Sequence, residues 1–361
     1  MKRKAVAIGV AGLCASTALA TQALAQNAVG AAGSAPECMP ATQQVPRRVQ
    51  LRPGADMPPP PRDLTISAIP GVVAAGGAWT KVWQGGGNSA DGVLPAREGG
   101  VLVAQEDFDT VLRITDDGKT SVAVSGAKGL GSISMDRQGR LYGVHRTERP
   151  GSTKPDRDSI VNAVTELAPE RRTVADHWAG GGALTVRPND LAADGRGGAF
   201  VTSGCLYYAD QAGVRVVADN LRTNGVVFSP DDKTLYVTNG GSVVAFDVTG
   251  PGTLANRRDF TALATGTSGD GLAVDTEGRL YVTSPPGVQV FDRTGKALGL
   301  IPTPRAVISI AFAGPGKKRL YVVGGGAEGA DGKPIHEGPQ LTAATLYRLP
   351  VEAQGLPDRA K

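Results

Sequence analysis

The chain has 361 residues, and 38 Lys and Arg residues against 34 Asp and Glu residues give it a formal net charge of +4. The charges are scattered and no basic block alternates with aromatic side chains, so the sequence excludes an extended nucleic-acid-binding surface. The 50 Gly and 25 Pro residues favour an all-β chain with many turns.

Residues 1–25 have the pattern of a secretory signal peptide. Lys2-Arg3-Lys4 precedes the apolar stretch Ala5–Leu19, which is too short to span a bilayer. The small-x-small tripeptide Ala23-Leu24-Ala25 predicts cleavage before Gln26. The sequence therefore predicts a periplasmic or secreted protein with no membrane span after cleavage, and an uncleaved anchor is the alternative.

Both ends of the predicted folded region have tails. Residues 26–62 are rich in Pro, including four in a row at 58–61, and are expected to be a tail or linker. Residues 351–361 are expected to be a C-terminal tail. Cys38 and Cys205 remain after cleavage. They either form a disulfide, which an oxidising compartment permits, or stay as two unpaired thiols.

One short strand pattern occurs six times between residues 63 and 350. Each copy follows a polar turn and an earlier apolar run, which is typical of a β-propeller. The sequence therefore predicts a six-bladed β-propeller with four-stranded blades. The six copies are Gly100–Val103, Gly139–Tyr142, Gly198–Val201, Thr234–Val237, Arg279–Val282 and Arg319–Val322.

The fifth blade shows the repeat most cleanly. Its four strands are predicted at Gly271–Val274, Arg279–Thr283, Val288–Phe291 and Lys296–Ile301, with Asp and Gly in the turns. By analogy, the other innermost strands are expected at Gly92–Pro95, Ser132–Met135, Asp190–Ala193, Gly225–Phe228 and Ile308–Phe312. The segment Leu64–Ile69 is expected to add an outer strand to the last blade and close the ring.

Two long loops, 145–160 and 324–340, follow second strands and are expected on the face where functional loops gather. The first is either a lid or a solvated insertion, and the second, which is rich in Gly, occupies the matching place in blade six. His145 begins the first loop and could bind substrate or carry a proton, because its pKa lies in the working range. A surface histidine is the alternative interpretation.

Polar residues stand where the innermost strands begin. They are Asp91, Asn189-Asp190, Asn224 and Asp270 in blades one, three, four and five, and Ser132 and Ser309 in blades two and six. Because inner strands converge on the axis, these side chains are expected to meet. Carboxylate and amide oxygens suit a hard cation such as calcium or, with stricter geometry, magnesium. Alternatively, each Asx-Gly pair is simply a turn.

Three segments in order, Arg187–Asp194, Thr223–Asp231 and Asp270–Asp275, resemble signatures of the gluconolactonase / senescence-marker-protein (regucalcin-like) family. Gly287–Asp292 strengthens the resemblance, which covers roughly residues 80–325. The resemblance implies a six-bladed propeller that hydrolyses lactones with one divalent ion at its axis.

The resemblance also implies roles for individual residues. Asp91, Asn224 and Asp270 would hold the metal, Asp270 would also act as the base, and Asn189 and Arg187 would contact the substrate. The chain departs from the family in blade one, where Asp91-Gly92-Val93 replaces Glu-Gly-Pro. Glu98 and Glu106 are therefore alternative first ligands.

These observations predict a metal-dependent lactonase that acts on a lactone or sugar-acid derivative. The cofactor would be one divalent cation, calcium first, with magnesium, manganese or zinc as alternatives. Two other functions stay open. One is a non-catalytic periplasmic binding propeller, since this fold also serves as a binding platform. The other is a propeller of the strictosidine-synthase or arylesterase type.

Overall fold

The computed structural model describes residues 63–85, 90–147, 160–329 and 344–357, which all belong to one compact unit of residues 35–361. The predicted signal peptide and linker, and most of the loops at 145–160 and 324–340, lie outside the described residues. Within these ranges the structure is all-β, as predicted. Helix is limited to two 3-10 turns, η2 (Glu106–Phe108) and η4 (Pro315–Lys317). None of the helical segments described is long and apolar enough to cross a membrane.

The strands form five antiparallel sheets in the described part of the chain. Four sheets have four strands each: β2 (Val93–Pro95), β3 (Val101–Gln105), β4 (Thr110–Ile114), β5 (Thr120–Val124); β6 (Leu130–Met135), β7 (Leu141–His145), β8 (Ala163–Ala168), β9 (Arg172–Ala175); β16 (Leu272–Val274), β17 (Leu280–Ser284), β18 (Gly287–Phe291), β19 (Ala297–Pro302); and β20 (Ser309–Ala313), β21 (Arg319–Gly325), β22 (Ala344–Pro350), β1 (Thr80–Gly85).

The fifth sheet has six strands: β10 (Leu191–Ala193), β11 (Ala199–Asp210), β12 (Gly213–Phe228), β13 (Thr234–Asn239), β14 (Ser242–Gly250) and β15 (Thr253–Ala262). Its long strand β12 pairs with β11 through its first part and with β13 through its last residues. The prediction of uniformly four-stranded sheets is therefore wrong here. The single strand β12 pairs with both β11 and β13, and so joins two sets of strands into one sheet.

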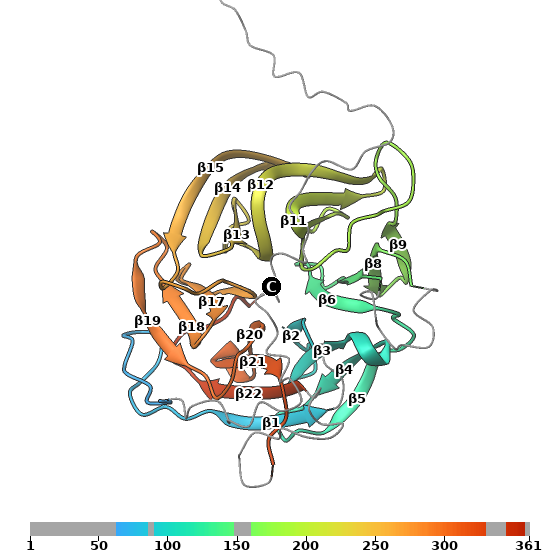
Figure 1. Ribbon diagram of the computed structural model, residues 1–361. Coiled ribbons are helices and arrows are strands. Elements are labelled where there is room, and N and C mark those ends of the chain that lie inside the picture. Colours follow the sequence, from blue (N-terminus) through green and yellow to red (C-terminus); the bar gives the residue numbers. More distant parts are fainter. Residues whose placement is uncertain (1–62, 86–89, 148–159, 330–343, 358–361) are drawn as a thin grey trace, which may run out of the picture. The chain divides into compact units, whose positions relative to one another are not determined.

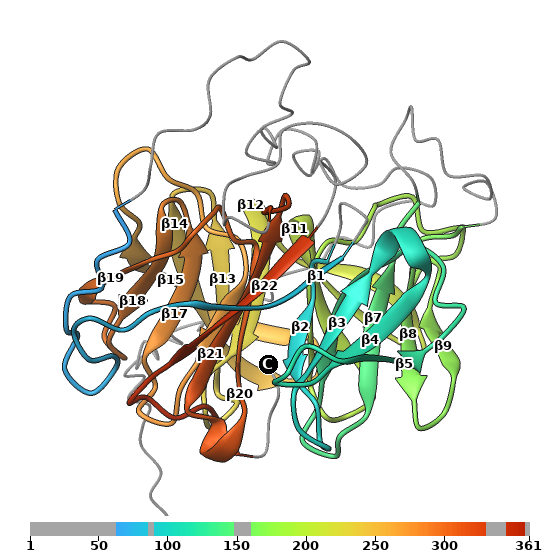
Figure 2. The same cartoon turned by 90° about the horizontal axis from the view of Figure 1, so that it is seen from below.

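The sheets are arranged around a common centre (Figure 1), and turning the molecule by 90° shows them side by side (Figure 2). The innermost strands are β2, β6, β10, the end of β12, β16 and β20. Each of them contacts the next in this order, and β20 contacts β2. Every predicted innermost strand agrees with one of these elements, although the fourth is only the last part of β12.

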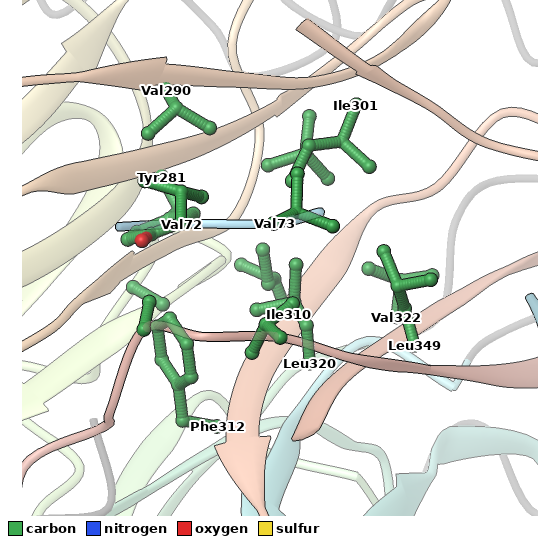
Figure 3. Close-up of a cluster of buried hydrophobic side chains, with 14 of the residues drawn as sticks. Val72, Val73, Tyr281, Val290, Ile301, Ile310, Phe312, Leu320, Val322 and Leu349 are labelled. Carbon is green, nitrogen blue, oxygen red and sulfur yellow. The ribbon is translucent and has the colours of Figure 1, made fainter. Parts of the chain in front are cut away.

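The last sheet is completed by β1, which pairs with β22. The expectation that Leu64–Ile69 would form this strand is wrong. Ile66 and Ile69 are buried, and with Val72 and Val73 they pack in the core between the sheets of β16–β19 and β20–β22 (Figure 3). The apolar residues of this segment fill a gap between sheets rather than an outer edge.

The described part of the predicted C-terminal tail also packs on this core. Ala353 is 1% exposed, and the amide of Glu352 donates to the carbonyl of Val72 over 2.8 Å. Residues 351–357 therefore help to cover the inserted segment.

A repeated turn precedes two of the second strands, β7 and β17. The sequence Asp-x-x-Gly-Arg-Leu-Tyr occurs at Asp136–Tyr142 and Asp275–Tyr281. The carboxylate of Asp275 is fully buried and accepts bonds from Arg279 Nε (2.6 Å) and the Tyr281 hydroxyl (2.8 Å). Because a buried carboxylate needs partners, this turn fixes the entry of β17.

Candidate functional site

Equivalent positions can be compared through strand pairing. In each inner strand one residue pairs with the fourth residue of the repeated second-strand pattern, as Val93 does with Val103. In blade two, Arg140–Gly143 aligns with Arg279–Val282, so the equivalent copy begins one residue later than the sequence had suggested, and its fourth residue Gly143 pairs with Ile133.

The residue two positions before this paired residue defines what we call the axial register. Its members are Asp91, Gly131, Asn189, Asn224, Asp270 and Ile308. Apart from Gly131, all of them are partly exposed, so solvent reaches the register.

The next residue along each inner strand holds neighbouring strands together. A Cβ at Gly225 would lie 2.1 Å from the carbonyl oxygen of Asp270, and one at Gly271 would lie 2.6 Å from that of Ile308. Glycine is needed at these two positions because the backbone of the following inner strand passes so closely. Asn224-Gly225 lies inside β12, so the turn interpretation is wrong for this pair.

Where this second position is not glycine, its side chain bonds the neighbouring strand. Ser132 Oγ donates to Asp190 Oδ1 over 2.8 Å, and Asp190 Oδ2 accepts from the amide of Val226 over 3.1 Å. Ser309 Oγ accepts from the amide of Val93 over 3.2 Å. The sequence had suggested that Ser132 and Ser309 belong with the axial residues. The structure instead places them one residue further along, where they tie inner strands to each other.

A buried arginine links the axial residues. Arg146, whose side chain is 2% exposed, directly follows β7. Its Nη2 donates to Asp91 Oδ2 over 3.1 Å, and its Nη1 donates to Asn189 Oδ1 over 3.0 Å. Its Nε and Nη2 donate to Glu106 Oε1 and Oε2 over 2.9 and 2.6 Å, so Glu106 receives a bidentate fork.

Arg187 joins the same network. Its Nη2 donates to Glu106 Oε1 over 2.7 Å, and its Nε donates to the carbonyl of Thr147 over 2.8 Å. Glu106 is 5% exposed at its side chain, whereas Arg187 is 23% exposed. The network thus has a buried part, Arg146 and Glu106, and a more exposed part, Arg187. Burial opposes the charge of Arg146, but Glu106 and Asp91 together raise its pKa above the ordinary value.

Arg146 also fixes the orientation of two amides. A guanidinium only donates, so the atom of Asn189 facing it must be the oxygen. Nδ2 of Asn189 therefore faces Asn224 and donates to Asn224 Oδ1. This chain of bonds runs from Arg146 through Asn189, which precedes β10, to Asn224 in β12, and it determines which amide atoms point at each neighbour.

Asp270 is adjacent to this chain through its backbone. Its carbonyl oxygen lies against Gly225, and its amide donates to the carbonyl of Thr283 over 2.9 Å. The structure thus brings the sequence-predicted residues Asp91, Asn189, Asn224 and Arg187 into one bonded network, and places Asp270 next to it.

His145 does not join this network. Its Nδ1 lies 2.6 Å from the carbonyl of Lys128, and the ring borders a separate pocket of about 290 Å³ that no residue of the axial register lines. Because successive strand residues point to opposite sides, the inward position of Arg146 directs His145 outward. Burial lowers the pKa of His145, so the ring is neutral near pH 7. The structure thus places His145 apart from the other predicted site residues, and its role in substrate binding stays a prediction.

The two alternative first ligands have different surroundings. Glu98 is 83% exposed at its side chain and lies 3.9 Å from Arg113. Glu106 is buried, but both of its oxygens accept from Arg146. Asp91 is thus the carboxylate of this sheet that stands in the axial register.

The sequence interpretation missed Arg146. Arg146 lies three residues after Gly143, the fourth residue of the pattern in blade two. The residues at this position in the six copies are Glu106, Arg146, Gly204, Gly240, Pro285 and Gly325. Charged side chains occur only in the first two. Aligning the repeats at this position would have singled out the buried ion pair.

The donor chemistry of the register fits a hard cation. In the described part of the chain, no three His, Cys, Asp or Glu side chains gather as a metal-binding group. Amide oxygens also bind hard cations, and Asn224 supplies one at the register position that carries the carboxylates of Asp91 and Asp270 in two other sheets. Carboxylate and amide oxygens are the ligands that calcium and magnesium prefer.

Comparisons with known proteins find a related family for part of the chain. Residues 162–325 match the family described as SMP-30/Gluconolactonase/LRE-like region. The matched region is slightly less than half of the chain. It contains Arg187, Asn189, Asn224 and Asp270, whereas Asp91, Glu106 and Arg146 precede it.

Two curated relatives and one solved structure extend the comparison. The chain is 31% identical to lactonohydrolase oryH of Aspergillus oryzae over 148 residues, covering 34% of this chain and 32% of that protein. It is 31% identical to pentonolactonase XacC of Haloferax volcanii over 192 residues, covering 48% of this chain and 65% of that protein. The chain thus spans less than two thirds of either relative.

The solved structure is a gluconolactonase of Xanthomonas campestris, with a TM-score of 0.58 and 23% identity, covering 81% of this chain and 95% of that chain. This likeness shows that the fold is that of a gluconolactonase-type propeller. The match at residues 162–325 places the family region on the sheets that carry three of the four polar axial residues.

Gly131 offers a test of this packing. A Cβ there would lie 2.3 Å from Arg146 Nε, so we expect Gly131→Ala to lower the free energy of unfolding by about 1–3 kcal/mol. A Cβ at Gly180 would have no such neighbour within 4 Å, so Gly180→Ala is the matched control and should change it by less than about 0.5 kcal/mol. Urea unfolding measures both, and equal effects would contradict the packing of Arg146 over Gly131.

Proposed function

We propose that this protein hydrolyses a lactone at the axial register. One observation carries the proposal: four inner strands present Asp or Asn at the same register, and three of these side chains share one hydrogen-bonded network. The names of the curated relatives, a lactonohydrolase and a pentonolactonase, support this class of reaction. A sugar lactone or a related sugar-acid derivative is the proposed substrate.

The residues of the register divide the chemistry among them. Asp270 would take a proton from the attacking water, whose oxygen bonds to the lactone carbonyl carbon. The ring C–O bond then breaks, and the leaving oxygen takes up a proton to give a hydroxy acid. Nδ2 of Asn189 is oriented as a donor, so it can stabilise negative charge that develops on the carbonyl oxygen. Arg187, whose side chain is partly exposed, would attract the carboxylate of the product.

We further propose that Asp91, Asn224 and Asp270 hold one divalent cation, calcium in the first place. Such an ion would supply Lewis acidity toward the lactone carbonyl and toward water. Asp91 is one methylene shorter than the glutamate that the family resemblance implies, and one of its oxygens accepts from Arg146. Weak and exchangeable binding of the ion is therefore expected.

The six innermost strands support counting six blades. We infer that the six-stranded sheet comprises two blades that share β12, because the first part of β12 pairs as an outer strand and its last residues pair as an inner one. On this count each blade contributes one residue to the axial register.

We also propose that the protein acts in an oxidising compartment outside the cytoplasm. Cys205 is disulfide-bonded, and the predicted partner Cys38 lies outside the described residues. The mature protein should begin at Gln26, and mass spectrometry of the purified protein before and after reduction measures both features. An intact Met1, or a Cys205 thiol that alkylates without reduction, would contradict this proposal.

Turnover of glucono-1,5-lactone tests the main proposal. Metal-stripped protein should be inactive, and added CaCl2 should restore acid release in a pH-stat. Asp270→Asn should lower kcat/KM at least a hundredfold, because it removes the base and one ligand charge. Asp292→Asn is the matched control, since Asp292 lies in the turn after β18 and only bonds Thr294 and Lys296.

Two results would count against hydrolysis. Unchanged turnover in Asp270→Asn would remove Asp270 from the chemistry. A rise in melting temperature with CaCl2 but no turnover of any aldonolactone would instead favour the non-catalytic binding propeller.

A further inference from the structure

Arg146 is the largest of the fully buried side chains in the described residues. Burying a cation costs free energy unless its hydrogen-bond donors and its charge are satisfied. Arg146 meets this requirement with four bonds to Glu106, Asp91 and Asn189. Two of these partners, Asp91 and Asn189, are members of the axial register itself.

The place of the guanidinium in the ring is specific. Blade two has Gly131 where four other blades carry Asp or Asn, and the Arg146 side chain lies over it, with Nε 2.3 Å from where a Cβ would be. The space that an axial side chain of blade two would fill is therefore taken by a positive charge. That charge lies between the axial residues of blades one and three.

A fixed cation in this position disfavours the binding of a second cation nearby. Like charges repel over these short distances, and screening by solvent is weak for a buried group. Asp91, which would share its carboxylate with a divalent ion, already has Oδ2 bonded to Arg146. We propose that Arg146 is an internal cation that lowers the affinity of the axial register for divalent ions, and that Glu106 partly neutralises it. This inference rests on the cation site of the proposed function.

The surrounding charges allow the two effects to be separated. Glu106 pairs with Arg187 as well as with Arg146, so it keeps a cationic partner when Arg146 is neutralised. Arg146 keeps Asp91 and Asn189 as acceptors when Glu106 is neutralised. Each variant thus changes the net charge near the register by one unit, while the remaining member of the Arg146–Glu106 pair keeps an oppositely charged partner.

The experiment is calorimetric titration of metal-stripped protein with CaCl2 alone, without any lactone. Arg146→Gln should tighten calcium binding at least tenfold, because the repulsive charge is removed and Asp91 is released. Glu106→Gln should weaken it at least tenfold, because the guanidinium is then less neutralised. Arg146→Lys keeps the charge and should stay within about threefold of the unmodified protein.

The signs of these changes decide between a charge role and a purely structural one. If Arg146 only positions Asp91 and Asn189, both Arg146→Gln and Glu106→Gln loosen the register and both weaken binding, which would overturn the proposal. Equal affinities in all variants would overturn it too. Because no substrate is present, a protein that hydrolyses no lactone can still give the expected pattern, so the two proposals fail separately.

A second variant keeps the test decisive if Arg146→Gln does not fold, as judged by circular dichroism. Arg146→Met combined with Glu106→Leu replaces the buried pair by apolar side chains, an exchange that proteins often tolerate. Arg146 contacts Asp91 directly, whereas Glu106 reaches it only through the guanidinium, so the net effect should still be at least threefold tighter binding. Unchanged or weaker binding in this variant overturns the proposal.

Discussion

The close approach of the six inner strands is the constraint on which the rest of the site depends. Backbone atoms of one inner strand lie against the next, so residues such as Gly225 and Gly271 can carry no Cβ. The neighbouring Thr238 and Thr283 hydroxyls bond the carbonyls of these glycines and hold the strand entries in place. As a result, the preceding residues Asn224 and Asp270 are held at one level around the centre. A rigid backbone scaffold thus places side chains from separate sheets within reach of one ligand.

The site contains positive as well as negative side chains. Two buried or partly buried guanidiniums, Arg146 and Arg187, share the carboxylate of Glu106, and Arg146 also bonds Asp91. A site with this composition is not a simple acidic cage. It has a built-in cation whose donors orient Asn189 and Asn224 and whose charge acts on whatever ion or oxyanion enters. The structure therefore couples the orientation of the polar groups to their electrostatics.

The sequence predicted the inner strands well because their short apolar runs follow recognisable turns. It failed for the strand that completes the last sheet, since the apolar residues of 66–73 fill a gap between sheets and β1 carries little apolar pattern. Asp91, Asn189, Asn224 and Asp270 were found from their shared place in the repeat. Arg146 was missed and His145 was favoured because both were assigned to a loop. Strand alternation, which sends the two side chains in opposite directions, was therefore not applied.

The central claim is that oxygens from separate sheets share one cation at the axial register. Crystals grown from metal-stripped protein and soaked in MnCl2, with data collected at the manganese absorption edge, test it most directly. We expect one anomalous peak within bonding distance of side-chain oxygens of Asp91, Asn224 and Asp270. An absence of density there in a well-ordered crystal, or an Asp270 carboxylate that faces away from Asn224, would contradict it.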